Sequence, residues 1–334
     1  MLRPKKVGER NAAPQERIGD TTYNSSTSIL LPTKTQHPEE KFTCESGRSI
    51  NGCAEERWLD LPDGRMRYLK AGSGPALILI HGLLGYSFSW RFAMPALARH
   101  ATVYAIDNLG AGLSTASKGI DYGIRATARR VFQFADAMGI QQFDLLGSSH
   151  GGGVAIMAAA MSEQEKSSRV RRLILVAPVN PWSSHGKQLA PFIGGAMGSF
   201  IFQHTVAQWR SLDYLWLSRM FGDITKIPPD SLQGYRIPVL ENNALDYGSQ
   251  VVKSWTADMA ALETALPKIR DIRTLLMWGT KDRAVAFRSA ERLRRNFRDA
   301  RLVTFEGVGH LPYEEASEEF NSALIDFLYG VSTS

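Results

Sequence analysis

The chain has 334 residues, of which 44% are hydrophobic and 22% charged, and 39 Lys and Arg against 33 Asp and Glu give a formal charge of +6. This composition is typical of a globular protein with a sizeable core, and it excludes a largely disordered chain, a collagen-like repeat and a disulfide-dense miniprotein. The densest basic stretch, from Arg288 to Arg301, has helical spacing and no interleaved aromatic residues, so it indicates a solvated helix face rather than a nucleic-acid site.

Residues 1–55 are poor in large apolar side chains and rich in Ser, Thr, Pro, Glu and Lys, which predicts an irregular N-terminal arm. The arm holds both cysteines, Cys44 and Cys53, which without clustered histidines do not make a standard zinc site. No apolar signal segment follows the basic start, and the nearly apolar stretch 190–202 is shorter than the ~20 residues of a membrane span. We therefore expect a cytoplasmic protein without stable membrane insertion, and the sequence leaves open whether the cysteines pair.

Short apolar runs begin near Trp58. Residues 57–61 and 66–70 flank the turn sequence Pro62-Asp63-Gly64, which predicts a β-hairpin. Further runs rich in Val, Ile and Leu, each bounded by Gly, Asn or Asp, predict strands that are buried on both faces. These runs cover residues 76–80, 101–106, 143–146, 172–176, 274–278 and 302–305.

Helical periodicity lies between the predicted strands. Apolar residues from Ile124 to Met138 share one helical face and are followed by Gly139, a typical helix stop. A second apolar face, from Phe320 to Leu328, marks the last helix. Strands that alternate with helices predict an α/β fold with a mainly parallel sheet covered by helices on both faces.

One interval breaks this alternation, because roughly 90 residues separate the strand that ends near Val179 from the next one at Ile272. The interval carries four of the seven tryptophans, and a structureless loop of that length is uncommon. We therefore expect an inserted helical cap. The predicted organisation is an arm over residues 1–55, a core over 56–180 and 272–334, and a cap over 181–271.

The strongest chemical signal is a G-x-S-x-G motif formed by Gly147, Ser149 and Gly151. It follows an apolar strand and precedes an Ala-rich helical run, which is the context of a nucleophile elbow. The turn is so sharp that only glycine fits two positions on either side of the nucleophile. Ser148 is the poorer candidate, since its register places Leu146 where a glycine is needed.

Two partners for Ser149 follow at strand ends. Asp282 comes directly after the run 274–278, and His310 comes after the last predicted strand between Gly309 and Leu311. Ser, then Asp, then His is the chain order of a hydrolase triad at the carboxyl edge of a sheet. The alternative acid position after the strand 172–176 holds no carboxylate, because Asn180 stands there.

The sequence His81-Gly82-Leu83-Leu84-Gly85 follows the run 76–80 and fits a loop that supplies an oxyanion-hole amide. We assign the oxyanion donors to the backbone N–H groups of Leu83 and His150. The His81 side chain is expected to brace the loop. The glycines of residues 107–114 are better interpreted as a structural loop near the site than as a phosphate loop.

Taken together, residues from about Trp58 to Leu328 resemble the α/β-hydrolase superfamily, specifically capped serine hydrolases of the AB hydrolase-1 type. The resemblance implies an eight-stranded, mostly parallel sheet with one antiparallel strand near its start, and a cap over the site. Its matches, in order, are His81-Gly82, the loop 107–114, Ser149, Asp282 and Gly309-His310-x-Pro312.

The sequence departs from that resemblance at two places. Ser148 and His150 replace the residues that many relatives carry in the elbow, and the usual proline after Glu315 is missing. Relatives that open epoxides or remove halides use an aspartate nucleophile, so Ser149 argues against both activities.

The expected function is hydrolysis of a carboxylic ester through an acyl-enzyme, with Ser149, Asp282 and His310 as catalytic residues and with no metal or other cofactor. A carbon–carbon bond hydrolase of diketone-type substrates and a ligand-binding receptor remain alternatives. The expected partner is a small molecule and not a nucleic acid, and the oligomeric state stays open. The cap segment is aromatic and has seven basic and seven acidic residues between positions 181 and 268, so we expect a small-to-medium neutral, apolar substrate.

Overall fold

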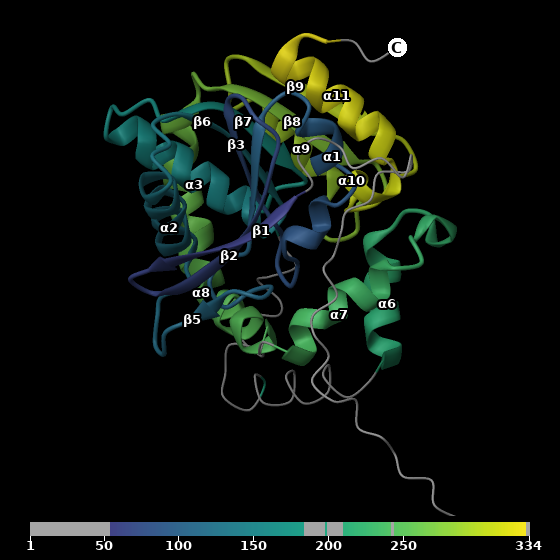
Figure 1. The fold of residues 1–334 in the computed structure, drawn as a ribbon. Coiled ribbons are helices and arrows are strands. Elements are labelled where there is room, and N and C mark those ends of the chain that lie inside the picture. The colour runs from purple at the N-terminus through teal and green to yellow at the C-terminus, as the bar shows by residue number, and fades with distance from the viewer. Residues whose placement is uncertain (1–53, 184–197, 199–209, 242–243, 332–334) are drawn as a thin grey trace, which may run out of the picture. The chain divides into compact units, whose positions relative to one another are not determined.

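The computed structural model describes residues 54–183, 198, 210–241 and 244–331 (Figure 1). Nearly all of the predicted N-terminal arm, including Cys44 and Cys53, lies outside these residues, as does part of the predicted cap. Within the described part of the chain, no helix is both long enough and apolar enough to span a bilayer.

A mostly parallel sheet forms the centre of the fold, with strands in the order β1-β2-β4-β3-β6-β7-β8-β9 (Figure 1). Strand β2 is antiparallel to both β1 and β4, and the pairings from β4 to β9 are parallel. The strands are β1 (Glu55–Leu61), β2 (Gly64–Ala71), β3 (Ala76–Ile80), β4 (Thr102–Ile106), β5 (Thr115–Ala116), β6 (Phe143–Ser148), β7 (Val170–Val176), β8 (Arg273–Gly279) and β9 (Ala300–Phe305).

The strands confirm the predicted hairpin and the positions of the six predicted runs, of which five are buried as expected. The run 302–305 is not, because β9 is an edge strand in which only Phe305 is buried, and the strand count is also corrected. The described sheet has nine strands rather than eight, because the two-residue strand β5 pairs with β2 at Gly64 and Arg65. The first strand was also predicted to begin at residue 57, whereas β1 begins at Glu55, inside the predicted arm.

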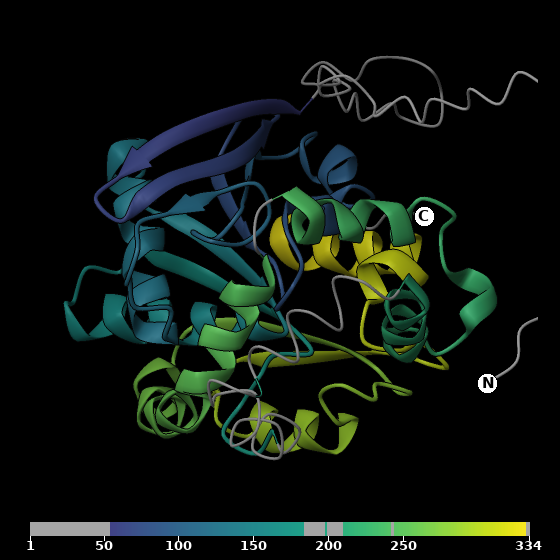
Figure 2. The same ribbon diagram turned by 90° about the horizontal axis from the view of Figure 1, so that it is seen from below.

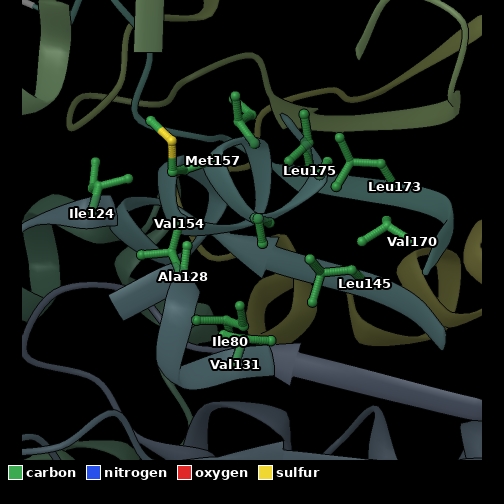
Figure 3. Packing of buried hydrophobic residues seen from close by; sticks show 14 of the residues in the cluster. Ile80, Ile124, Ala128, Val131, Leu145, Val154, Met157, Val170, Leu173 and Leu175 are labelled. Carbon is green, nitrogen blue, oxygen red and sulfur yellow. The ribbon is translucent and has the colours of Figure 1, made fainter. Parts of the chain in front are cut away.

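The central strands are buried on both faces because their alternate residues enter two separate cores. On β3, Ile78 and Ile80 join the cluster formed with α2 (Ile124–Ala137) and α3 (His150–Gln164). Figure 3 shows Ile80, Ala128, Val131, Leu145 and Val154 in this layer. Leu77 and Leu79 face the opposite cluster, which α11 (Ser317–Tyr329) covers.

The remaining short helices lie in the loops between strands and after the last strand. They are η1 (Ser87–Trp90), α1 (Met94–Leu97), η3 (Leu266–Ile269), η4 (Phe287–Ser289), α9 (Ala290–Arg294) and α10 (Pro312–Glu315). Residues of η1, α1 and α10 pack in the same cluster as α11, whereas residues of η3 and α9 pack in the cluster of α2 and α3. The sheet is therefore covered on both faces, as the sequence predicts.

The long interval between β7 and β8 contains α6 (Arg210–Met220), η2 (Ile224–Lys226), α7 (Ser231–Glu241) and α8 (Ala244–Ala265). Figure 2 shows α6 and α7, the green helices near the C label, beside the yellow C-terminal helices. Helix α8 reaches the core, because Trp255, Met259 and Leu262 pack in the cluster of α2 and α3. The expected cap segment thus contributes one helix to the core itself.

A buried polar network attaches α7 to the core. Glu314 of α10 accepts hydrogen bonds from Arg91 and Ser231, both at 2.9 Å, and from the Tyr235 hydroxyl. Arg91 also pairs with Asp230 at 3.1 Å. Because Arg91 and Glu314 are both buried, each needs the other to compensate for the loss of water. This network fixes the position of α7 beside the carboxyl edge of the sheet.

Candidate active site

Ser149 stands between the end of β6 and the start of α3 with a backbone φ of 53° and ψ of −120°. A positive φ in a residue other than glycine costs on the order of 1–3 kcal/mol, so the surrounding contacts must hold it in place. Its backbone N–H donates to Val176 at 2.9 Å, and its carbonyl accepts from Val179 at 2.8 Å. These two bonds join Ser149 to the last residue of β7 and to the turn that follows it, and they hold the serine in its strained conformation.

The flanking glycines are required by contact. A Cβ on Gly147 would collide with the carbonyl oxygen of Gly151, and a Cβ on Gly151 would collide with the carbonyl of His81. The turn therefore brings β6, α3 and the end of β3 too close together for any side chain. This is the physical reason for the G-x-S-x-G pattern at this place.

Asp282 and His310 form a direct pair at the neighbouring strand ends. The Nδ1 atom of His310 lies 2.7 Å from Oδ2 of Asp282, and both side chains are almost fully buried. The other carboxylate oxygen, Oδ1, accepts the backbone N–H groups of Ala284 at 2.8 Å and Val285 at 2.9 Å. The two oxygens of Asp282 therefore have different partners. Oδ1 binds the backbone of the turn, and Oδ2 binds the imidazole of His310.

The backbone around His310 is held by Glu315 and by α6. The carboxylate of Glu315 accepts the N–H groups of Gly309 at 2.8 Å, Gly222 at 2.9 Å and Asp223 at 2.7 Å. The N–H of His310 donates to the carbonyl of Met220 at 2.6 Å. The imidazole is thus positioned jointly by the last core loop and by the end of α6.

The loop that follows β3 passes directly beside the nucleophile candidate. Ile80 on β3 pairs with Gly147 on β6, and a Cβ placed on Gly82 would lie 3.1 Å from the Cβ of Ser149. Within the described residues, neither the Leu83 N–H nor the His150 N–H donates a hydrogen bond to another loop, turn or strand end. Both amides are therefore available to a ligand.

His81 and His150 differ in their surroundings. Nδ1 of His81 donates to the Gly82 carbonyl at 2.7 Å, and its Nε2 accepts the Asn108 N–H at 3.0 Å, which confirms the predicted bracing role. Burial lowers the pKa of His81, and burial together with His81 lowers the pKa of His150 to about 4. Both imidazoles are therefore neutral near pH 7.

The side chains of Asp107 and Asn180 both have structural partners. Asp107 is fully buried, and its carboxylate accepts N–H groups from Ser87 at 2.7 Å and Leu113 at 3.1 Å while facing Arg67. Asn180 donates to Pro178 at 3.0 Å and braces the turn after β7. Neither side chain contacts His310.

A cavity of about 330 Å³ lies at this edge of the sheet, and Ser149, His310, Leu83 and His150 all line it. Asp282 does not line the cavity but contacts His310, which does. The structure therefore brings all five sequence-predicted site residues together. The apolar lining comes from Leu83, Leu84, Val179, Trp216, Met220, Val252, Trp255, Val285 and Leu311.

Three residues at this site were not predicted from the sequence. Glu315 was noted only as part of a motif, although its position five residues after His310 signals a carboxylate near the same loop. Arg219 and Arg283 also line the cavity. Arg283 directly follows Asp282, whereas no pattern singles out Arg219 on α6.

The sheet order, the strained serine and the His–Asp pair define the α/β-hydrolase class, and the comparison with known families agrees. The model of the α/β-hydrolase fold matches residues 75–317, and the chain belongs to this family. The predicted family and fold are therefore confirmed, and the matches indicate a hydrolase enzyme.

This chain matches several named relatives over nearly the whole length of each relative. The chain is 30% identical over 283 residues to haloalkane dehalogenase 2 of Mycobacterium bovis, covering 81% of this chain and 94% of the relative. It is 28% identical over 275 residues to 2-hydroxy-6-oxo-6-phenylhexa-2,4-dienoate hydrolase of Comamonas testosteroni, covering 80% and 93%.

Solved structures give the same fold. A bacterial membrane phospholipase A matches with a TM-score of 0.67 and 25% identity over 84% of this chain and 87% of that chain. A meta-cleavage product hydrolase matches with a TM-score of 0.69 and 22% identity over 82% and 98%.

Proposed function

We propose that the protein is a serine hydrolase that cleaves carboxylic esters through an acyl-enzyme. The observation that carries this proposal is the strained Ser149 in one cavity with His310, whose Nδ1 lies 2.7 Å from Asp282. His310 accepts the proton of Ser149 Oγ as the oxygen attacks the carbonyl, and it then protonates the leaving alcohol. Water repeats the cycle on the acyl-enzyme.

The remaining groups orient the His310 imidazole and stabilise the oxyanion. Asp282 keeps the proton of His310 on Nδ1, so that Nε2 is free to accept. The backbone N–H groups of Leu83 and His150 hold the oxyanion, each contributing about 2.7–4 kcal/mol to lowering the barrier. The helices α6, α7 and α8 form a cap over the cavity. Its lining includes Trp216 and Met220 of α6, Tyr235 of α7, and Val252 and Trp255 of α8. This chemistry needs no cofactor, and we expect it in the cytoplasm.

The named relatives include a dehalogenase, but Ser149 stands at the nucleophile position where such enzymes carry an aspartate. A carbon–carbon bond hydrolase is the second candidate, favoured by the 28% identity to a hydrolase named for a dienoate substrate. A serine nucleophile fits this reaction as well as ester cleavage. The receptor alternative is less favoured, because a binding site alone does not require the strained serine.

A series of 4-nitrophenyl esters with acyl chains of two to ten carbons tests the ester proposal. We expect kcat/KM to rise by up to about fourfold per methylene, the equivalent of ~0.8 kcal/mol, until the apolar cavity is full. The control is a vinylogous 1,5-diketone of similar size. Turnover of the diketone without turnover of any ester would favour the second candidate, and a flat chain-length dependence would contradict an apolar acyl site.

The pH profile follows from the three histidines near the site. The pKa of His150 is lowered from 6.5 to about 4, so His150 stays neutral from pH 5 to 8, and burial also lowers the pKa of His81. A loss of kcat/KM with falling pH in this range is the signature of a catalytic general base, and His150 does not supply it. We expect an approach to a tenfold loss per pH unit on the acid side, measured with an ester substrate.

Folding stability must be measured alongside, because His150 also couples folding to pH. Its pKa is lower in the folded state than in the unfolded chain, so the unfolded chain binds the extra proton between about pH 6.5 and 4. Stability is therefore complete above this window and falls as the pH drops through it. A circular dichroism spectrum that is unchanged across this range separates loss of the general base from unfolding, and a flat activity profile from pH 5 to 8 would contradict a histidine base.

A further inference from the structure

Two arginines give the cavity a positive charge. Among its described lining residues, Arg219 and Arg283 are charged, and no aspartate or glutamate lines it. Both side chains are exposed, so their guanidinium groups are accessible from solvent. The equal numbers of acidic and basic residues in the segment 181–268 led us to expect a neutral substrate, but that average does not describe the charges that reach the cavity.

Each of the two arginines is next in sequence to a residue that is hydrogen-bonded to His310. Arg219 precedes Met220, whose carbonyl accepts the His310 N–H at 2.6 Å. Arg283 follows Asp282, whose carboxylate lies 2.7 Å from the His310 imidazole. Each arginine is therefore one residue away from a group that is bonded directly to His310.

Within the described residues, neither arginine has an ion-pair partner. Other exposed arginines do have one, since Arg298 pairs with Asp271 and Arg301 with Asp326. Residues 184–209 and 242–243 contain no acidic residue in their sequence, so those parts of the cap segment offer no carboxylate either. The positive charge at the cavity thus has no paired carboxylate among the side chains that the structure describes.

We propose that the substrate carries a carboxylate at the end of its apolar body, and that Arg219 and Arg283 bind this carboxylate. The inference rests on the proposed serine hydrolase and specifies its substrate class as an anionic acyl compound. Guanidinium groups form charge-assisted, two-pronged hydrogen bonds to carboxylates, which gives them selectivity for this group. The apolar lining then holds the part of the substrate between the carboxylate and the scissile bond.

The test compares two esters that differ only in charge. These are the mono-4-nitrophenyl ester of adipic acid and 4-nitrophenyl 6-methylheptanoate, in which an isopropyl group replaces the carboxylate. We expect kcat/KM to be higher for the adipate ester, and Arg219→Gln and Arg283→Gln to lower this preference by about threefold to tenfold each. Raising the salt concentration from 50 to 500 mM should also weaken the preference, because salt screens exposed charges.

Arg99→Gln is the matched control, because Arg99 is exposed and precedes the opposite, amino-terminal end of β4. It removes the same charge and should leave the preference unchanged. A preference for the neutral ester, or a preference that neither cavity arginine affects, would overturn the inference while leaving the serine hydrolase intact.

Binding gives a readout that does not depend on turnover. We expect the full-length protein to bind 6-phenylhexanoate more tightly than 6-phenylhexanamide, and the double variant Arg219→Gln/Arg283→Gln to lose this difference. If neither ester is hydrolysed, the proposed function fails, and the binding comparison still decides whether the cavity selects a carboxylate. Equal binding of acid and amide by the unaltered protein would overturn the inference.

Discussion

Replacing Ser149 with alanine is expected to lower kcat by about 10⁴-fold or more for any ester that the protein hydrolyses. The substitution removes the Oγ atom and keeps the Cβ, so the strained backbone at φ 53° is left as it is. The melting temperature should therefore change little, as measured by calorimetry. The loss would be in catalysis and not in folding.

Ser148→Ala is the matched control for this variant. Ser148 is the adjacent residue and is fully buried, its hydroxyl donates to the Tyr313 hydroxyl at 3.5 Å, and it does not line the cavity. We expect this variant to keep its activity within a few fold. Full activity of Ser149→Ala, or loss of activity in Ser148→Ala at unchanged stability, would contradict the proposed register of the elbow.

Asp282→Asn is expected to lower kcat by about 10⁴-fold with little change in KM. The reason is that the two carboxylate oxygens of this side chain have different partners. Oδ1 accepts the N–H groups of Ala284 and Val285, so an asparagine keeps its oxygen on that side and turns its NH₂ group toward His310. The imidazole then accepts at Nδ1 and carries its proton on Nε2, where it cannot take a proton from Ser149.

Asp271→Asn serves as the control for this second substitution. Asp271 is exposed and pairs with Arg298 at 2.7 Å, so its loss removes one carboxylate from the same chain without touching the site. We expect less than a twofold change in kcat. An Asp282→Asn variant with activity within tenfold of the unaltered protein would show that another group orients His310.

The central strands were predictable because burial on both faces leaves a run of apolar residues. Ile78 and Leu79 enter opposite cores, and neither position accepts a polar residue without cost. The strand β5 was not predictable, because its two residues form only a short pairing with β2 and carry no periodic signal. The packing of α8 against α2 and α3 was also hidden, since an apolar face does not state which surface it covers.

The parts of the site that depend on particular side chains could be predicted from the sequence. Ser149, Asp282 and His310 are recognisable from the turns that they occupy, whereas Leu83 and His150 were placed only by position because any residue has a backbone N–H. The two arginines at the cavity, by contrast, could not be predicted from the sequence. Charge counts cannot tell which side chains of a segment face the substrate, and only the fold brings Arg219 and Arg283 to the same cavity as His310.

Labelling with a fluorophosphonate, followed by mass spectrometry of the digested protein, tests the central claim most directly. This reagent forms a covalent bond to an activated serine, so the account predicts one phosphonylated peptide with the modification on Ser149. The adduct should be absent in Ser149→Ala and should form far more slowly in His310→Ala. A folded protein that remains unlabelled, or that carries the adduct on a different serine, would contradict the assignment of Ser149 as a nucleophile activated by His310.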